Sequence, residues 1–184
     1  MGLASVSNVI NSTCRAICQA MMEKNLKLPN TTAEWVQVGE GFYMECDFPN
    51  CIGAIDGKHF KIKKPQDSGS IYFNYKHSFS ILMLALVDAN MKFLYVDVGA
   101  PGHCSDAGLW GKCDLKKLIE EDTLQIPKDR VFPESDKSSP MVIVGDDAFP
   151  LKTYLMKPWP GSTVGDEEKT IFNARLVLMM IITL

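Results

Sequence analysis

The chain has 184 residues, which is enough for one domain with a hydrophobic core but too few for two full-sized domains. Its 19 lysines and arginines stand against 22 aspartates and glutamates, so the formal net charge of −3 excludes a strongly basic protein that coats nucleic acid. Apolar residues make up 46% of the chain, a normal share for a globular protein, and no apolar run reaches the roughly 18 residues of a membrane span.

The chemistry of the N-terminus and of the cysteines points to a reducing compartment. Residues 1–19 carry polar side chains at positions 11–13, where a secretory signal would be apolar, so we expect no export. The six cysteines form no CxxC pair and are expected to be reduced thiols. A zinc site built from His103, Cys104 and Cys113 matches no common zinc module, so we expect structural cysteines there.

Two helices are predicted before any strand. Residues 3–28 have apolar side chains at roughly helical spacing. A second helix is predicted to begin in the stretch 31–34, with a threonine as its N-cap, and to end at Gly39 and Gly41. We therefore expect residues 1–49 to form an α-helical lead-in.

Four strands are predicted in the centre of the chain. Residues 51–63 alternate between apolar and polar side chains in their second half. The unbroken apolar run 79–87 is typical of a central strand buried on both faces. A turn at 88–90 leads to its hairpin partner at 92–98, and residues 141–144 form a short apolar strand.

Breaks and caps bound the remaining elements. We expect residues 99–102 to end the third strand. One continuous helix is predicted from there to the acidic stretch 120–122, with either Ser105 or Asp106 as its cap. Residues 151–156 are expected to form a helical turn.

A last helix is predicted from Ile171 onward, which completes the order of elements. The predicted order is two helices, three strands, a helix, a strand and a helix. This order is typical of an α/β or α+β layered sheet with helices packed against it. Because the fourth strand follows a helical connection, we expect it to lie parallel to the first.

Three aspartates stand at the ends of apolar elements rather than in charged surface runs, namely Asp56, Asp106 and Asp146. Burying a carboxylate is costly without a compensating cation, and a cluster of carboxylates suits a hard divalent cation such as Mg²⁺. Each residue also has a structural interpretation, since aspartate is a common turn former and a good helix cap. Asp147 is an alternative to Asp146, because strand alternation lets only one of them point into a site.

Positive charge is concentrated just after the first aspartate. Lysines on an exposed strand can protect a sheet edge, but next to Asp56 they can also contact a DNA backbone. His59 and His77 are either DNA contacts or packing residues. The predicted nucleic-acid contacts are Lys58, His59, Lys61, Lys63 and Lys76.

Five blocks of the sequence resemble, in the right order, those of the PIF/Harbinger superfamily of transposases and the nucleases domesticated from them. The first is FPNCIGAIDGKH and the fourth is GDDAFPL. The blocks lie at residues 48–59, 72–81, 99–106 with Trp110, 145–151 and 171–176.

The resemblance implies an α/β fold, an RNase H-like mixed sheet flanked by helices, with a DDE-type nuclease domain at residues 50–184 behind the α-helical N-terminal lead-in. It implies that Asp56, Asp106 and Asp146 are the catalytic residues and hold a divalent metal cation, Mg²⁺ or alternatively Mn²⁺, to hydrolyse DNA. It further implies location in the nucleus, with the cytoplasm as a second compartment, and a Myb/SANT-like DNA-binding partner protein.

The sequence departs from the family pattern at both ends. The family's final helix carries an arginine and then the catalytic glutamate, whereas residues 177–184 contain no acid and the glutamate would fall at about Leu184. Residues 4–10 resemble the second helix of the helix-turn-helix that precedes the family's catalytic domain, so we expect a chain truncated at both ends.

Three functional hypotheses stay open. The first is a metal-dependent nuclease weakened by the missing third acid. The second is a catalytically inactive domesticated transposase fragment that binds DNA or protein. The third is an inert fragment that does not fold stably.

Overall fold

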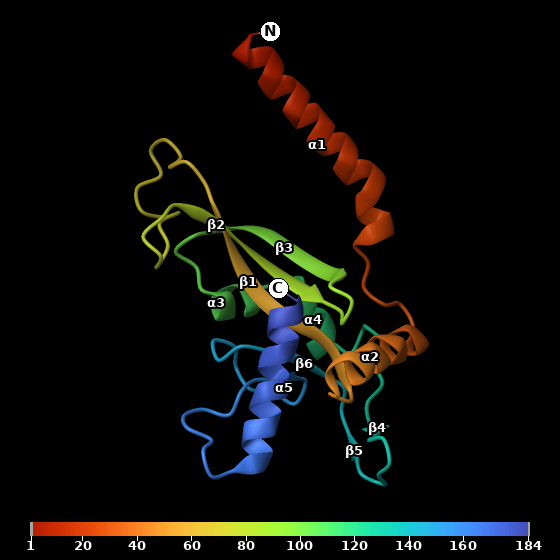
Figure 1. Ribbon diagram of the computed structural model, residues 1–184. Coiled ribbons are helices and arrows are strands. Elements are labelled where there is room, and N and C mark those ends of the chain that lie inside the picture. The colour runs from red at the N-terminus through yellow and green to blue at the C-terminus, as the bar shows by residue number, and fades with distance from the viewer. Residues whose placement is uncertain (1, 184) are drawn as a thin grey trace.

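A computed structural model describes residues 2–183 of the chain. The helices are α1 (Leu3–Asn25), α2 (Thr32–Cys46), α3 (Asp106–Trp110), α4 (Asp114–Glu120) and α5 (Glu167–Thr183). The strands are β1 (Cys51–Lys61), β2 (Ser80–Val87), β3 (Phe93–Pro101), β4 (Arg130–Val131), β5 (Ser138–Ser139), β6 (Val142–Gly145) and β7 (Leu155–Met156). The arrangement of these elements is drawn in Figure 1.

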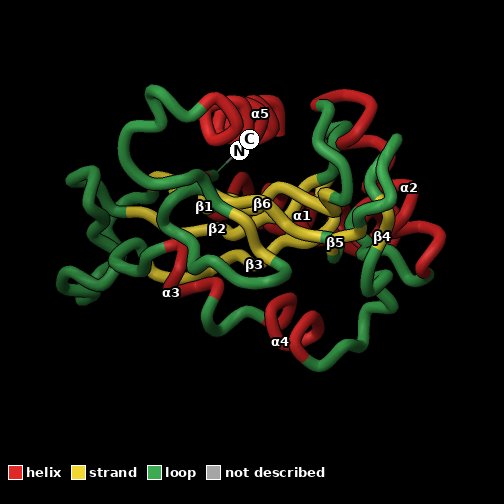
Figure 2. Tube along the Cα trace, turned by 90° about the horizontal axis from the view of Figure 1, so that it is seen from below, coloured by secondary structure: helices red, strands yellow, loops and turns green. Residues whose placement is uncertain are grey.

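The centre of the molecule is a five-stranded mixed sheet in the order β3-β2-β1-β6-β7. β1, β2 and β3 are antiparallel neighbours, whereas β1, β6 and β7 run parallel. Figure 2 shows α5 over one face of the sheet and α3 and α4 over the other. The predicted mixed sheet flanked by helices is confirmed, as is the parallel fourth strand, and the architecture is consistent with an RNase H-like fold.

Alternating strand residues build two apolar clusters, one on each face of the sheet. Ile55 packs with Trp110 in the cluster on the α3–α4 face. Ala54 and Val144 pack with Leu176 in the cluster on the α5 face. Because successive residues of a strand point to opposite faces, this assignment gives the facing of the positions of β1 from Ala54 onward, beyond the register shift between Cys51 and Gly53.

α2 begins as the sequence predicts but ends later. Thr31 and Glu34 form a reciprocal capping box, which satisfies the first free N–H groups of the helix. The prediction that Gly39 and Gly41 end the helix is wrong. A Cβ on Gly39 would lie 2.8 Å from the Met141 Cε, so this glycine allows the helix to approach the sheet closely.

The predicted break at residues 99–102 is also wrong, since β3 continues to Pro101. Gly99 has a φ of 125° and coincides with a shift in the β2–β3 register, as in a β-bulge. The following helix is capped by Ser105, whose side chain accepts the Gly108 N–H at 3.1 Å. It is not continuous, because a turn separates α3 from α4.

The sequence analysis did not predict two short β-structures. Residues 151–156 form no helical turn, because they end in β7, which adds to the sheet beside β6. The small hairpin of β4 and β5 lies in a segment expected to be a loop. Each of these strands has only two residues, too few for a periodic pattern.

The N-terminal helix stands apart from this core. α1 projects away from the sheet (Figure 1), and none of its residues is buried. α2, by contrast, contributes Phe42 to the cluster that also contains Leu176 of α5. Among the described residues, no helix combines the length and hydropathy that a bilayer crossing requires, and the six cysteines are all free thiols.

Candidate active site

Asp56 lies where β1 loses one of its two neighbours. Residues up to Ile55 are paired with β6, whereas the strand beyond Asp56 is paired with β2 only, as far as Lys61. The buried half of β1 thus passes into an exposed two-stranded ribbon at this residue. The Asp56 side chain is partly buried, so it combines the low dielectric of the core with access from outside.

Asp146 is the neighbour of Asp56 across the parallel strands. Ile55 lies opposite Gly145, so Asp56 and Asp146 are the next residues of two strands that run in register. Strand alternation directs Asp56 to the α5 face, whereas Asp146 lies just beyond the end of β6, in the turn that follows it. The Asp146 Oδ1 accepts the Ala148 N–H at 3.0 Å, which fixes the turn after β6.

Asp106 approaches β1 from the other face. It is the first residue of α3, and a Cβ on Gly57 would overlap its carboxylate. Since Gly57 follows Asp56, it points to the α3–α4 face. Asp56 therefore faces the α5 side of β1 and Asp106 lies against the opposite face of the same strand, while the negative charge of Asp146 acts on both.

The compact metal cluster that three acids on one face would give is not formed. Within residues 2–183, no three or more His, Cys, Asp or Glu side chains are grouped closely enough to hold a metal ion. This includes His103, Cys104 and Cys113, the weak zinc candidate. The carboxylates nevertheless act on one another electrostatically.

Burial raises the pKa of Asp56, and the negative charges of Asp106 and Asp146 raise it further. Burial also raises the pKa of Asp106, followed by the charge of Asp146, whereas His59 and Lys76 lower it. Holding these carboxylates ionised is therefore costly without a nearby positive charge.

Asp147 is drawn away from this group. Its Oδ1 lies 3.0 Å from the Lys157 Nζ, which also donates to the Asp147 backbone carbonyl at 3.0 Å. The Asp147 side chain is 76% exposed. Of the two adjacent aspartates, Asp146 is thus the one that shares an electrostatic environment with Asp56 and Asp106.

The donor chemistry of the three aspartates fits a hard divalent cation. Carboxylate oxygens are the protein ligands that Mg²⁺ and Mn²⁺ prefer, and a bound cation would offset the mutual repulsion of the side chains. Gly57 leaves the room that the Asp106 carboxylate occupies beside β1.

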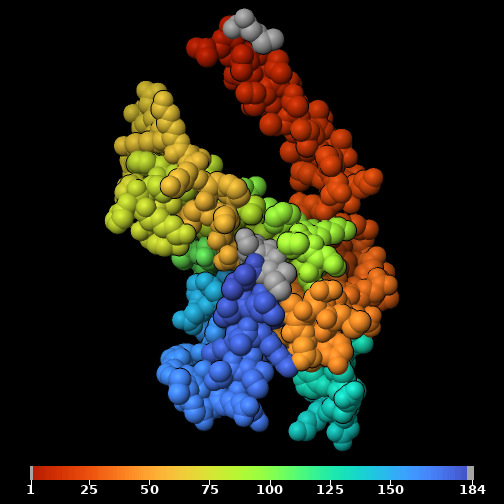
Figure 3. Space-filling view, in the orientation of Figure 1, coloured from red at the N-terminus to blue at the C-terminus, as the bar shows by residue number. Residues whose placement is uncertain are grey.

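The predicted lysines lie on an arm that projects from the sheet beside the carboxylates. This arm consists of the exposed end of β1 and the loop 62–79, seen at the upper left of Figure 3. Lys76 Nζ lies 5.2 Å from the centroid of the Tyr75 ring, a cation–π distance. No ion pair in the described part of the chain involves Lys58, Lys61, Lys63, Lys64 or Lys76.

Two residues, one in this arm and one at the adjoining start of β2, were missed by the sequence analysis. Asn74 and Ser80 are buried polar residues, and the Ser80 Oγ lies 2.9 Å from the His59 Nδ1. The one available signal was a serine, Ser80, inside the otherwise apolar run 79–87. His77, the other histidine considered, is exposed and has a φ of 57° in a turn.

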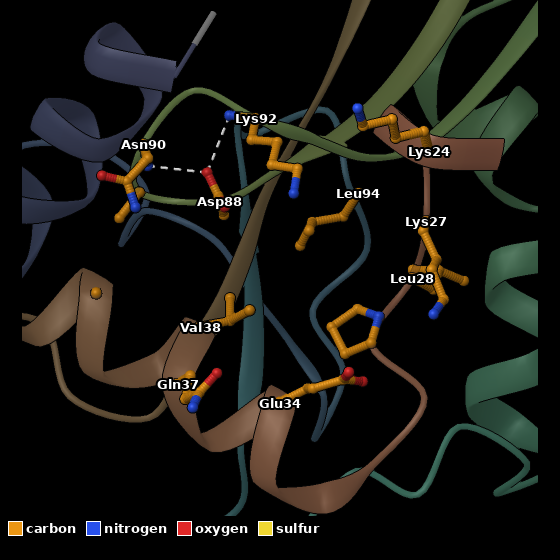
Figure 4. A pocket seen from close by; sticks show the side chains of 13 residues that line it. Lys24, Lys27, Leu28, Glu34, Gln37, Val38, Asp88, Asn90, Lys92 and Leu94 are labelled. Carbon is orange, nitrogen blue, oxygen red and sulfur yellow. Dashed lines mark hydrogen bonds between the residues drawn. The ribbon is translucent and has the colours of Figure 1, made fainter. Parts of the chain in front are cut away.

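A separate pocket of about 350 Å³ lies where the end of α1 approaches α2 and the β2–β3 turn (Figure 4). Lys24, Lys27 and Lys92 line it, together with two carboxylates. The Asp88 Oδ1 accepts the N–H groups of residues 90 and 92, and the Glu34 carboxylate serves the capping box of α2. Both carboxylates therefore already accept hydrogen bonds from backbone N–H groups, so we do not interpret the pocket as a second metal-binding site.

The sequence matches a family model described as DDE superfamily endonuclease over residues 55–182. It is 28% identical to "Protein ALP1-like" of Arabidopsis thaliana over 92% of this chain and 41% of that protein. It is 26% identical to "Putative nuclease HARBI1" of Rattus norvegicus over 83% of this chain and 41% of that protein. The chain therefore spans about two fifths of the length of these relatives. No solved structure matches the chain.

Proposed function

This chain belongs to the Harbinger-derived family of DDE superfamily endonucleases, and we propose that it is a metal-dependent nuclease domain that hydrolyses phosphodiester bonds of DNA. One observation carries the proposal: Asp56 and Asp146 directly follow Ile55 and Gly145, the last paired residues of the parallel strands β1 and β6. We assign residues 50–184 to the nuclease domain and residues 1–49 to the helical lead-in, in which α1 has no buried residue and α2 packs against the sheet.

Asp56 and Asp146 would hold the cation, with Asp106 stabilising it from the other side of β1. When bound, a divalent cation stabilises negative charge on a phosphodiester and makes water a stronger acid. The three carboxylates supply negative charge and oxygen donors, and the partial burial of Asp56 limits the water that competes for the site. These residues need no separate general base, because the acidity of the water comes from the metal.

The arm would hold the DNA beside the carboxylates. Lys58, Lys61 and Lys63 are exposed on or next to the end of β1, and Lys76 lies within electrostatic reach of Asp106. Lysines that contact phosphates orient the backbone without reading its sequence. DNA is the proposed substrate, the nucleus the proposed location, and a Myb/SANT-like DNA-binding protein the proposed partner.

A second candidate function is a DNA-binding module without catalysis. It is favoured by the composition of α5, which has no acidic residue after Glu168. It is also favoured by the lack of a group of three metal-ligating side chains within residues 2–183. The position where the family pattern would place its glutamate, Leu184, lies outside the described residues.

Nicking of supercoiled plasmid DNA distinguishes the two candidates. Wild-type protein should nick with Mg²⁺ or Mn²⁺ and not with EDTA, and Asp56→Asn and Asp146→Asn should abolish nicking. Asp147→Asn is the matched control, since the Asp147 carboxylate pairs with Lys157, and it should nick as wild type does. Equal nicking by Asp56→Asn would reject the nuclease proposal. DNA binding without nicking by the wild type would select the second function.

A further inference from the structure

A chain of buried hydrogen bonds connects the loop of the arm to β1. Its members are Asn74 in the loop, Ser80 at the start of β2 and His59 on β1, and we call them the relay. Asn74 is 4% exposed and Ser80 is 0% exposed. Buried polar side chains are costly unless every donor and acceptor is used, so the directions of these hydrogen bonds can be worked out.

The Asn74 amide has one orientation that satisfies its neighbours. Its Oδ1 accepts the backbone N–H groups of Lys76 at 3.0 Å and Ser78 at 3.1 Å. An amide turned the other way would set its NH₂ group against these two donors. The Asn74 Nδ2 therefore faces the Ser80 Oγ, to which it donates at 2.8 Å.

The hydrogen bond from Asn74 determines the role of the Ser80 hydroxyl toward His59. Its Oγ accepts from Asn74, so its single hydroxyl hydrogen is free to donate. The His59 Nδ1 lies 2.9 Å from the Oγ, and no other acceptor for this hydroxyl is found among residues 2–183. If the His59 Nδ1 carried a hydrogen, the fully buried hydroxyl would be left without an acceptor. The Nδ1 is therefore the acceptor, and the hydrogen of the neutral ring is on Nε2.

The ring is also held in place sterically. A Cβ on Gly102 would come within 2.5 Å of the Ser80 Oγ, so the chain passes close to this hydroxyl. The His59 ring packs edge-on against Tyr75, with centroids 5.6 Å apart. No hydrogen bond of the Nε2 is found within the described part of the chain, so this donor is available to a ligand.

His59 and Asp106 lie on the same face of β1. His59 is two residues beyond Gly57, so both point to the α3–α4 face, and Gly57 is in contact with the Asp106 carboxylate. The spacing of two strand residues is about 6.6 Å. Asn74 also fixes the backbone N–H of Lys76, whose charge acts on Asp106. One buried amide thus orients the Ser80 hydroxyl beside His59 and holds the backbone at Lys76.

We propose that the relay positions His59 as an Nε2–H donor to a phosphate oxygen of bound DNA, with Ser80 and Asn74 as its positioning residues. The inference rests on the proposed function for its ligand, but the direction of the hydrogen bonds does not. A phosphate is the group that matches a fixed N–H donor next to an unpaired lysine, because it offers anionic acceptors to both.

The tautomer can be measured on the wild-type protein. The chain has three histidines, and a His59→Gln spectrum identifies the signals of His59 by subtraction. At about pH 8, above the ordinary pKa of histidine, a long-range ¹H–¹⁵N correlation spectrum should show a protonated Nε2 and an unprotonated Nδ1. A protonated Nδ1 or an even mixture would overturn the inference.

The function of the relay is tested by DNA binding in EDTA, where cleavage cannot interfere. Fluorescence anisotropy of a short labelled duplex should show roughly tenfold weaker binding by His59→Asn, which loses the donor. His59→Gln keeps an N–H at the ε position and should stay within about twofold of wild type. His77→Asn is the control for an exposed histidine, and Asn tolerates its positive φ. Equal losses in all three variants would overturn the inference.

A double-mutant cycle separates positioning from general structure. Ser80→Ala should weaken DNA binding in the wild-type background and have no further effect in the His59→Asn background. Equal losses in both backgrounds would mean that Ser80 acts through the fold, and the positioning role would be rejected. Circular dichroism checks folding. If Ser80→Ala does not fold, Asn74→Asp replaces it, because that change removes the donor to Ser80.

Failure of this inference and failure of the nuclease proposal give different results. Wild-type protein that binds DNA without nicking it rejects the nuclease but leaves the His59 contact to be decided by the binding variants. Wild-type protein that shows no binding in EDTA rejects the His59 contact, whereas nicking with Mg²⁺ would still support the nuclease.

Discussion

The carboxylates on the two faces of β1, Asp56 and Asp106, have different charged neighbours. On the α3–α4 face, Asp106 lies near His59 and Lys76, which lower its pKa and partly offset its burial. On the α5 face, burial and the charges of Asp106 and Asp146 raise the pKa of Asp56, whereas the Gly57 backbone N–H and the charge of Lys58 lower it. Two carboxylates raise the pKa of Asp56 and one raises that of Asp106, so a cation would relieve more repulsion at Asp56, while Lys76, which acts on Asp106, is suited to a phosphate.

The largest expected effect compares aspartates from the two faces. Asp56→Asn should lower Mg²⁺-dependent nicking by at least about 100-fold, because it removes a metal ligand, whereas Asp106→Asn should lower it by roughly tenfold. Initial rates on supercoiled plasmid measure both. Equal losses in the two variants would remove the distinction between the faces.

The next effect concerns the contact of Asp106 with β1. Gly57→Ala should lower the free energy of unfolding by about 1–3 kcal/mol, since the added Cβ overlaps the Asp106 carboxylate and displaces α3. Gly41→Ala is the control. Its Cβ would meet the Ala89 Cβ at an ordinary 3.5 Å, so it should stabilise α2 by about 0.5–1 kcal/mol. Urea unfolding that finds Gly57→Ala as stable as wild type would mean that Asp106 does not press against this strand.

A smaller effect is expected from the arm. Replacing Lys61 or Lys63 with Ala should reduce the slope of log affinity against log salt concentration by about 1 for each phosphate that the variant no longer neutralises. Lys128, which lies 3.9 Å from Asp122 and outside the arm, is the control. Anisotropy titrations over a range of salt concentrations measure the slope. An unchanged slope would place the DNA elsewhere on the molecule.

The smallest effect is the stability cost of the Asp56 charge. Its pKa is raised on folding, so the ionised form destabilises the fold, and the difference appears as pH rises from the ordinary pKa of 3.8 through the folded-state value. In EDTA, Asp56→Asn should therefore be more stable than wild type at neutral pH, by a few tenths to about 1 kcal/mol after allowing for solvent screening. If thermal melts across this pH range show no increase in the stability of Asp56→Asn over wild type, the Asp56 charge does not destabilise the fold.

The sequence was most informative where a pattern is local. The apolar runs predicted the central strands, and the helical connection before the fourth strand predicted that it lies parallel to the first. The capping box of α2 is likewise contained in four consecutive residues. In these cases the decisive contacts follow from strand pairing or helix geometry alone.

The sequence failed where the decisive partner is distant. The choice between Asp146 and Asp147 depends on Lys157, ten residues further along. The role of Gly39 depends on Met141. The facing of Asp106 depends on how α3 packs against Gly57, and no periodicity encodes that contact.

The most direct test of the central claim is a calorimetric titration of Mn²⁺ into the wild-type chain and the variants Asp56→Asn, Asp146→Asn and Asp147→Asn. If Asp56 and Asp146 hold the cation together, each of their variants should bind Mn²⁺ at least about tenfold more weakly than wild type, and Asp147→Asn should match wild type. The same affinity in all four proteins would contradict the account.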